Sequence, residues 1–345
     1  MTRILAIRPR ALGDVVLVTP ALRALARIPG ATLDVATERP YAPLLEGLPR
    51  VARVWRMGRA ARDTARLAVE LRRQRYDVAV DFFGNPRTAL LTAATGAPLR
   101  AGYRLRGRLG AYHRRVPRSV VAERGEREYA AAVHLRLARA VGGIDDGLDA
   151  RIAIGADARA AAERTLAACG IEAPDQVVGL VAAGTWATKT WPLSHSAVLA
   201  RRLIEAGFGV LALIGPGERH VGRALAALVP GLHVLPPCDV PALAAVIARL
   251  HAVVGTDSGP RHLAAALGVP TFAWFGPTHP DTWNPPGSSH GWWWTELPCR
   301  GCDRTACPHW SCMPSLAPER AAALVLDHLA RHVRPAADLG PAARA

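Results

Sequence analysis

Short, almost uninterrupted apolar segments alternate along the chain with longer segments in which apolar residues recur every three to four positions. In the first half, the apolar segments are ILAIR at 4–8, LDVAT at 33–37 and VAVDF at 78–82. Such runs are typical of parallel strands that are covered on both faces. The segment 60–75 instead places leucines on one helical face and arginines on the other. This alternation predicts a doubly wound α/β domain.

The same pattern fades between residues 100 and 150 and begins again in the second half. Apolar strands are predicted at 177–181, 210–214, 252–255 and 271–275, with helices near 194–206 and at 240–252. A chain of 345 residues is long enough for two hydrophobic cores. We therefore expect an α/β protein with two doubly wound, Rossmann-like domains that face each other across a cleft. Their predicted bounds are 1–172 and 173–334, followed by a disordered tail at 335–345.

The turns that follow the strands are the places to look for chemistry, because ligands of open α/β sheets bind beyond the carboxyl ends of the strands. The first turn reads RPRALGD, where Gly13 allows a tight turn and Asp14 stands at the start of the next helix. Two interpretations of Asp14 are open: a carboxylate that stabilises the helix at its N-terminus, or a general base. The turn lacks a G-x-G-x-x-G pattern, which argues against a nicotinamide dinucleotide site.

Two turns of the second domain carry residues suited to phosphate and ribose. In AAGTWATKTWP, Gly184 lets a ligand approach the backbone, while Thr185 and Lys189 offer a hydroxyl group and a compact cation to a phosphate. An ordinary loop with a surface lysine is the alternative. After the next strand, Glu218 heads a helix. Its carboxylate either stabilises the helix through the positive end of the helix dipole or binds ribose hydroxyl groups, as an acidic residue does in dinucleotide folds.

The segment GTDSGPRHLAAALG gathers several polar residues where another strand ends. Asp257 and Ser258 are capping residue types, and Gly259 permits close contact with a ligand. The helix that follows directs its unpaired N–H groups at whatever lies beyond the strand, which makes an anion site. His262, one turn into this helix, is placed to donate to a phosphate or a sugar hydroxyl group. A satisfied cap and a structural histidine explain each residue separately, but their concentration favours a binding site.

The charge of the chain points to anionic partners. There are 43 basic and 28 acidic residues, a formal net charge of +15, and Lys189 is the sole lysine. This balance favours nucleic acid, an anionic membrane face or a phosphorylated substrate, although arginines on solvated helix faces also explain most of it. We find no signal-peptide pattern and no membrane-spanning run, so we expect a cytoplasmic protein.

Four of the six cysteines lie close together in CRGCDRTACPHWSC, at Cys299, Cys302, Cys307 and Cys312. In a reducing cytoplasm such crowding suggests a metal before it suggests disulfides. Four thiolates at this spacing could close a tetrahedral, structural zinc site. The alternative is that a short loop buries the cysteines as small apolar groups.

These parts suit sugar transfer from a nucleotide diphosphate, because that reaction needs a base for the incoming hydroxyl group and positive groups for the departing diphosphate. At these residues the chain resembles glycosyltransferase family 9, the ADP-heptose:lipopolysaccharide heptosyltransferases. The resemblance spans about 3–330 and rests on ALGDVVLVTPALRAL, YAPLLEGLPRVARVW, DFFGNPRTALLTAATGAPLRAGY, GTWATKTWP, GTDSGPRHLAAALGVP and FGPTHP. The string DSGPRHLAAALGVP is highly specific, whereas the Gly-Asp turn alone is a weak signal.

The resemblance implies a GT-B fold and an inverting transfer of heptose from ADP-heptose to the lipopolysaccharide inner core, without a cofactor or a catalytic metal. It implies that the first domain binds the acceptor and the second binds the donor. It also implies that Asp14 is the catalytic base and that Lys189 contacts the phosphates. The donor-binding residues would then be Gly184, Thr185, Lys189, Glu218, Asp257, Ser258, Gly259 and His262.

A basic segment at 104–118 fits a phosphorylated glycolipid acceptor or the anionic cytoplasmic face of the inner membrane. Its first arginines, Arg104, Arg106 and Arg108, are the candidate acceptor contacts, although a solvated loop explains them equally. Three other functions stay open: transfer of another nucleotide sugar to a different glycan, a nucleotide-sugar epimerase or hydrolase, and a basic nucleic-acid-binding protein. The chain lacks a recognisable nucleic-acid-binding motif, so we expect no nucleic-acid partner.

Overall fold

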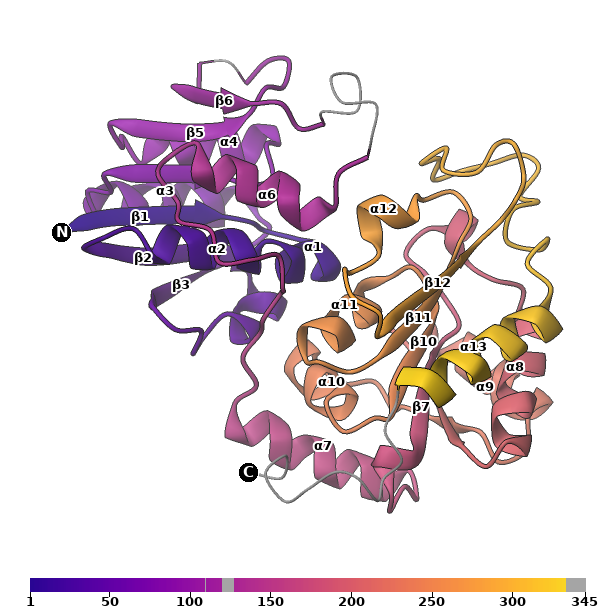
Figure 1. The fold of residues 1–345 in the computed structure, drawn as a ribbon. Coiled ribbons are helices and arrows are strands. Elements are labelled where there is room, and N and C mark those ends of the chain that lie inside the picture. The colour runs from indigo at the N-terminus through magenta and orange to yellow at the C-terminus, as the bar shows by residue number, and fades with distance from the viewer. Residues whose placement is uncertain (109, 120–126, 333–345) are drawn as a thin grey trace. The chain divides into compact units, whose positions relative to one another are not determined.

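The protein divides into two compact units, Met1–Gly155 and Ala156–Ala345. A computed structural model describes residues 1–108, 110–119 and 127–332 (Figure 1). The tail predicted at 335–345 lies outside these residues. Each unit is built on one sheet of six parallel strands, as the sequence pattern predicts.

The first unit contains a sheet in the strand order β3-β2-β1-β4-β5-β6, which is the order of a Rossmann fold. Its strands are β1 (Thr2–Ile7), β2 (Ala31–Glu38), β3 (Val51–Met57), β4 (Val78–Asp81), β5 (Leu99–Tyr103) and β6 (Arg114–Val116). Its helices are α1 (Leu12–Leu17), α2 (Thr19–Ala26), the 3-10 helix η1 (Arg39–Leu44), α3 (Ala61–Arg73), α4 (Pro86–Ala94) and α6 (Ala130–Arg139). The short strand β6 lies inside the segment 104–118, for which the sequence predicts only an irregular loop.

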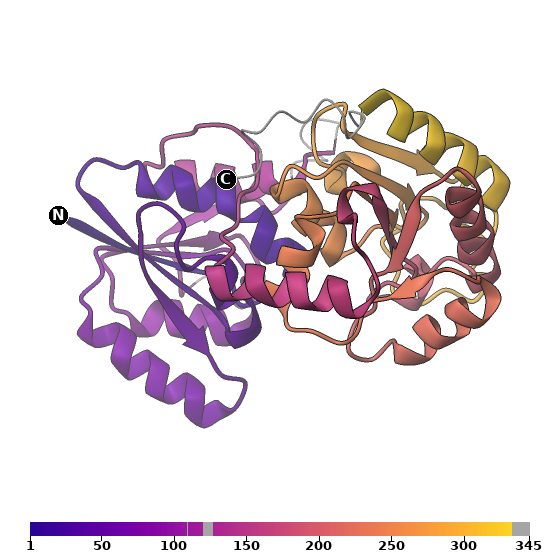
Figure 2. The same cartoon turned by 90° about the horizontal axis from the view of Figure 1, so that it is seen from below.

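Helices cover both faces of this sheet, and the alternation of side chains along β1 shows how. Ile4 and Ala6 belong to the core that α2 and α6 cover, whereas Leu5 and Ile7 belong to the core that α3 and α4 cover. Figure 2 shows the same layering, with the indigo helices on one side of the strands and the purple helices on the other. The near-continuous apolar runs of the strands follow from this double burial.

The second unit repeats the topology in the order β12-β11-β10-β7-β8-β9. Its strands are β7 (Val177–Val181), β8 (Gly209–Ala212), β9 (His233–Val234), β10 (Ala252–Thr256), β11 (Thr271–Phe275) and β12 (His290–Trp294). Its helices are α7 (Ala156–Ala168), η2 (Pro174–Gln176), η3 (Ala187–Lys189), α8 (Leu193–Glu205), α9 (Arg219–Leu228), α10 (Val240–Ile247), α11 (Gly259–Ala266), α12 (Pro280–Trp283) and α13 (Pro318–His332). Reading outward from β7, this is again the Rossmann order.

The division between the units falls before α7, earlier than the sequence-based boundary after residue 172. The helix α7 packs along α10 of the second unit, and Glu163 on α7 forms an ion pair with Arg249. An alanine-rich helix carries no sequence signal for the sheet it will cover, so this boundary depends on packing. In the described part of the chain, no helix has the length and apolar character needed to cross a membrane.

Candidate active site

The turn after β1 fixes Asp14 by two interactions. Asp14 lies in the first turn of α1, and its Oδ2 accepts a hydrogen bond from the backbone N–H of Ala11, 3.3 Å away. The Nη2 atom of Arg8 lies 2.5 Å from its Oδ1. The Asp14 side chain is nevertheless 29% exposed. The residue is therefore a helix-start carboxylate and, in addition, a carboxylate that solvent or a substrate can reach.

Arg8 is a buried residue of this site that the sequence analysis missed. It is 1% exposed, its Nη1 donates to the carbonyl of Phe82 at 2.5 Å, and its guanidinium lies over the ring of Phe83. The neighbouring strands explain this, since Ile7 pairs with Asp81 and the next residues of both strands therefore meet. The available signal was an arginine directly after a fully apolar strand.

The turn after β4 is held by the buried carboxylate of Asp81. It accepts hydrogen bonds from the backbone N–H groups of Phe83 and Gly84, both at 2.9 Å, and from the hydroxyl group of Tyr112 at 2.6 Å. Burial raises the pKa of Asp81, against the effect of these hydrogen bonds. The network fixes the position of the Phe82 carbonyl, to which Arg8 is bound.

The three candidate acceptor arginines differ from one another. Arg104 and Arg106 are exposed. Arg108 is half-buried and hydrogen-bonds the carbonyls of Gly84, Arg106 and Gly107. Arg108 therefore holds its own loop against the turn after β4. A role of these arginines in acceptor binding stays a prediction.

In the second unit, Lys189 is held between polar and aromatic groups. It ends η3 in the turn after β7, where its Nζ lies 2.8 Å from Oδ2 of Asp257. The same Nζ lies over the indole rings of Trp186 and Trp283, 4.5 and 5.7 Å from their centroids. The hydroxyl group of Thr256 donates to the Lys189 carbonyl at 2.5 Å. The sole lysine of the chain is thus a placed cation and not a solvated surface charge.

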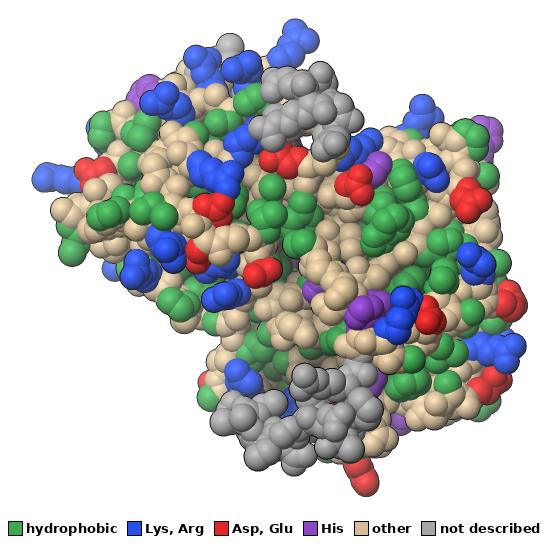
Figure 3. Space-filling view, viewed as in Figure 1, with side chains coloured by type: hydrophobic (Ala, Val, Ile, Leu, Met, Phe, Trp, Pro, Cys, Tyr) green, Lys and Arg blue, Asp and Glu red, His purple; other side chains and the backbone are tan. Residues whose placement is uncertain are grey.

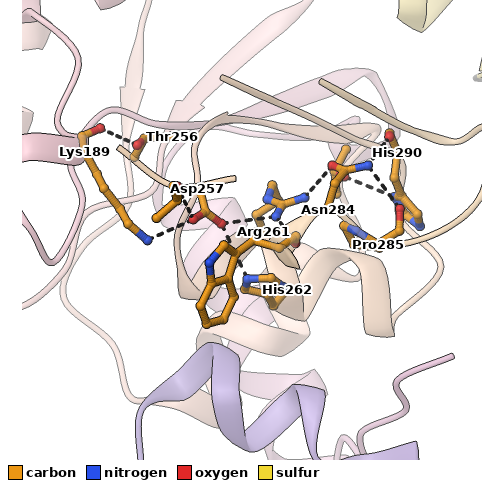
Figure 4. A network of polar contacts seen from close by, with 11 residues as sticks. Lys189, Thr256, Asp257, Arg261, His262, Asn284, Pro285 and His290 are labelled. Atoms are coloured by element: carbon orange, nitrogen blue, oxygen red, sulfur yellow. Dashed lines mark hydrogen bonds and ion pairs between the residues drawn. The ribbon is translucent and has the colours of Figure 1, made fainter. Parts of the chain in front are cut away.

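Asp257, directly after β10, is the centre of this network (Figure 4). Its carboxylate is 2% exposed and also contacts Arg261 Nη2 at 3.2 Å and His262 Nε2 at 3.7 Å. Burial alone would raise the pKa of Asp257, but the charge of Lys189, the hydrogen bond from His262 and the charge of Arg261 outweigh it and hold that pKa well below its usual range. One ionised carboxylate therefore lies between two cations, and the cluster keeps an excess positive charge.

The start of α11 carries polar atoms that lack partners. Ser258 is the N-cap residue, yet its hydroxyl group makes no capping hydrogen bond. Among the described residues, neither Ser258 Oγ nor His262 Nδ1 has a hydrogen-bond partner, although both atoms are buried. Burial lowers the pKa of His262, which favours a neutral ring. Buried polar atoms are normally satisfied, so these two atoms are available to a bound ligand.

Gly184, Thr185 and Glu218 lie in the neighbouring turns. A Cβ atom at Gly184 would lie 3.4 Å from Lys189 Cβ and 3.5 Å from Thr256 Cγ2, in ordinary van der Waals contact with the cluster. Thr185 is exposed. Glu218 is the N-cap residue of α9, and its Oε2 accepts a hydrogen bond from the backbone N–H of Gly215 at 2.8 Å. This bond closes a turn in the described fold, and a ribose contact stays a prediction.

The four crowded cysteines do not form a metal centre in the described residues, where no group of three or more His, Cys, Asp or Glu side chains could hold a metal ion. Cys299 and Cys302 are exposed, Cys307 is half-buried and Cys312 is buried. Burial raises the pKa of Cys312, and Cys299 and Cys302 raise it further. Backbone N–H groups of Trp310 and His309 lower the pKa of Cys307.

Comparison with known proteins decides the family. The model of glycosyltransferase family 9 (heptosyltransferase) matches residues 64–311. Lipopolysaccharide heptosyltransferase 1 of Pseudomonas aeruginosa is 32% identical over 328 residues, which cover 89% of this chain and 88% of that protein. The chain belongs to glycosyltransferase family 9. The protein is therefore a glycosyltransferase.

Solved structures agree on the fold of this family 9 glycosyltransferase. A family 9 glycosyltransferase from Veillonella parvula is similar with a TM-score of 0.82 at 18% identity, over 96% of this chain and 97% of that one. The Escherichia coli ADP-heptose heptosyltransferase II is similar with a TM-score of 0.78 at 23% identity, over 96% and 99%. Together with the two Rossmann-like units, these similarities confirm the GT-B fold predicted from the sequence.

Proposed function

We propose that this family 9 glycosyltransferase moves heptose from ADP-heptose onto the inner core of lipopolysaccharide, with inversion at the transferred carbon. The observation that carries the proposal is the cluster of Lys189, Asp257 and the start of α11, with its excess positive charge and its unpartnered Ser258 and His262 atoms. The name of the P. aeruginosa relative supplies the sugar and the acceptor.

In this proposal the second unit binds the donor. Lys189 and the backbone N–H groups at the start of α11 face the diphosphate, where they neutralise the charge that develops as the bond to the sugar breaks. Ser258 donates to a phosphate or sugar oxygen. The neutral ring of His262 gives its Nε2–H to Asp257, so its Nδ1 accepts a hydrogen bond from a sugar hydroxyl group. Gly184 and Thr185 allow close approach of the donor, and Glu218 accepts from the ribose hydroxyl groups. These groups meet the electrostatic need of the reaction without a metal.

The first unit supplies the base. Asp14 takes the proton of the acceptor hydroxyl group as its oxygen forms the new bond to the anomeric carbon, while the bond from that carbon to the diphosphate breaks and ADP leaves. Arg8 orients the Asp14 carboxylate through their ion pair. Proton removal by a fixed carboxylate and departure of a neutralised diphosphate are the two events that an inverting transfer requires.

The acceptor is proposed to be a phosphorylated glycolipid at the cytoplasmic face of the inner membrane. Arg104 and Arg106 are exposed, and exposed arginines attract phosphate groups and anionic lipid head groups. The net charge of +15 adds long-range attraction to such a surface. We propose that the protein associates peripherally with that surface while it works.

A structural zinc ion in the loop at 299–312 stays a separate prediction, which the chemistry of transfer does not use. The thiols of Cys299 and Cys302 lie near enough to Cys312 to influence its pKa. An ion would need this loop to close further, because no described group could hold a metal as it stands.

A donor screen followed by a transfer assay tests the proposal. Thermal unfolding of the protein is measured with ADP-, UDP-, GDP- and dTDP-sugars, and ADP-heptose is expected to raise the midpoint most, because a ligand that binds only the folded state stabilises it. Lipopolysaccharide that lacks inner-core heptose is then supplied as acceptor, and ADP release is expected to depend on it. Rapid consumption of donor without acceptor would favour a hydrolase or an epimerase. A larger rise of the unfolding midpoint with another sugar nucleotide would identify that nucleotide as the donor in place of ADP-heptose.

A further inference from the structure

Arg261 is a buried cation that the donor-site roles above leave without a task. It lies on α11, is 1% exposed, and its side chain lies between Asp257 and Asn284 in Figure 4. Its Nη2 contacts Asp257 Oδ1 at 3.2 Å and donates to the carbonyl of Trp283 at 2.6 Å. Its Nη1 donates to Asn284 Oδ1 at 3.0 Å. Its guanidinium also lies over the ring of Phe275.

These contacts join three separate parts of the second unit. Asp257 follows β10, Trp283 ends α12 after β11, and Asn284 in turn donates to the carbonyl of His290 at the start of β12. Arg261 therefore links the carboxylate of the donor cluster to the segment 280–284, in addition to the ring contact between His262 and Trp283. The segment also contacts the cluster directly, because the indole of Trp283 lies next to Lys189.

The two terminal nitrogens of Arg261 suit this position better than a single ammonium group would. Its planar guanidinium carries five N–H donors in a fixed fork and can bind a carboxylate, a carbonyl and an amide oxygen at once. A lysine ammonium would replace the charge beside Asp257 but could not reproduce this geometry. Burial of an unpaired guanidinium costs free energy. The partners that the segment 280–284 supplies therefore stabilise Arg261, and Arg261 in turn holds that segment in place.

We propose that Arg261 is a positioning residue for the donor. It fixes the segment 280–284, and with it the Trp283 indole, so that Lys189 is held between Trp186, Trp283 and Asp257 at the place where the diphosphate binds. The proposal rests on the proposed function, since it assigns Lys189 to the donor diphosphate. Arg261 itself need not touch the donor, because it acts through the residues that confine the lysine.

A double-mutant cycle tests this link with ADP as the probe, measured by calorimetry. Arg261→Met is expected to weaken ADP binding by about tenfold, since a hydrogen-bonded charged group is lost from the support of the site. Trp283→Leu is expected to weaken it less. Because Arg261 acts by placing Trp283, the double variant is expected to bind ADP about as weakly as Arg261→Met alone.

Trp186→Leu is the matched control, because Trp186 also lies against Lys189 but comes from the turn after β7. Trp186→Leu and Arg261→Met are expected to weaken ADP binding independently, so that the two fold-changes multiply in the double variant. Turnover gives a second measurement: the KM for the donor is expected to rise in Arg261→Met, while the KM for the acceptor stays unchanged. A merely structural role would change both together.

The outcomes separate the two proposals. Failure of the unaltered protein to bind ADP contradicts the proposed function. Tight ADP binding by the unaltered protein and by a folded Arg261→Met variant alike overturns the positioning role and leaves the function standing. The proposal is also overturned if the fold-changes in ADP affinity of Arg261→Met and Trp283→Leu multiply in the double variant, because the two residues then act independently. If Arg261→Met does not fold, Arg261→Lys replaces it in the cycle, and an unchanged ADP affinity in that variant overturns the proposal as well.

Discussion

Arg8 Nη2 and Asp14 Oδ1 lie 2.5 Å apart, in a pair in which the arginine is buried and the carboxylate is partly exposed. The second unit has a carboxylate of the opposite kind, since Asp257 is 2% exposed and contacts two cations. The accessible carboxylate is the one that can meet an incoming hydroxyl group. The buried one holds Lys189 and Arg261 in place, and its contact with the donor stays a prediction. The two aspartates therefore have separate roles in the proposed reaction.

Replacing Asp14 by asparagine is expected to abolish most transfer. The amide keeps the size of the side chain but cannot accept a proton, so we expect kcat to fall by about 100- to 10,000-fold, the range of general-base catalysis. ADP binding, measured by calorimetry, is expected to change little, because Asp14 belongs to the other unit. Asp63→Asn is the matched control: Asp63 accepts from the N–H of Ala60 in the first turn of α3, as Asp14 accepts from Ala11. Retained turnover in Asp14→Asn would end the base assignment.

Replacing Lys189 by methionine is expected to weaken ADP binding by about 10- to 100-fold, the loss of a hydrogen bond to a charged group. The unfolding midpoint is also expected to fall, because Asp257 stays buried with one cation fewer. Arg300→Met is the control, since it removes another cation that lies over an indole, that of Trp294. Equal ADP affinity in Lys189→Met and the unaltered protein would show that the lysine does not contact the diphosphate.

The buried His134 is expected to make the first unit less stable at mildly acidic pH. Burial, with the charges of Arg8 and Arg118, holds the pKa of His134 well below 6.5. Below pH 6.5 the unfolded chain therefore binds a proton that the folded unit does not, so the free energy of unfolding falls as the pH drops, by up to about 1.4 kcal/mol per pH unit. The effect fades as the pH rises above about 7, because the histidine of the unfolded chain is then also mostly neutral.

His134→Gln is expected to flatten this dependence between pH 7 and pH 5, since the amide does not titrate and can still bond Tyr103, whose hydroxyl group lies 2.6 Å from His134 Nδ1. Chemical unfolding at several pH values measures the change. His113→Gln, at an exposed position of the same unit, serves as the control. An equal slope in His134→Gln and the unaltered protein would contradict the prediction.

The zinc prediction makes its own measurable claim. Elemental analysis of protein purified without chelator is expected to find about one zinc per chain. Cys299→Ser is expected to lower that content, whereas Cys169→Ser, outside the crowded segment, is not. Removal of the metal is expected to lower the unfolding midpoint, because the ion would tie the loop at 299–312 together. If protein purified without chelator contains no zinc, the four cysteines do not form a zinc site.

Most of the candidate site could be predicted from the sequence because each residue stands in a local signal. Lys189 and Asp257 lie in the turns where strands end, and His262 lies one turn into the helix that follows; parallel strands bring those turns to one edge of a sheet. The partners of these residues could not be predicted in the same way. Arg261 reads as one more arginine in an arginine-rich chain, and nothing near it in the sequence shows that Trp283 and Asn284 will bind it.

The sequence by itself determined the two Rossmann-like repeats and the positions of the polar turns, because the period of the apolar residues and the residues of the turns are local properties. Only the tertiary structure decided that α7 belongs to the second unit, that Arg8 binds both Asp14 and the turn after β4, and that Lys189 is confined by two indoles and a carboxylate. Such contacts join residues far apart in the chain. Their energies depend on burial and distance, and a linear pattern contains neither.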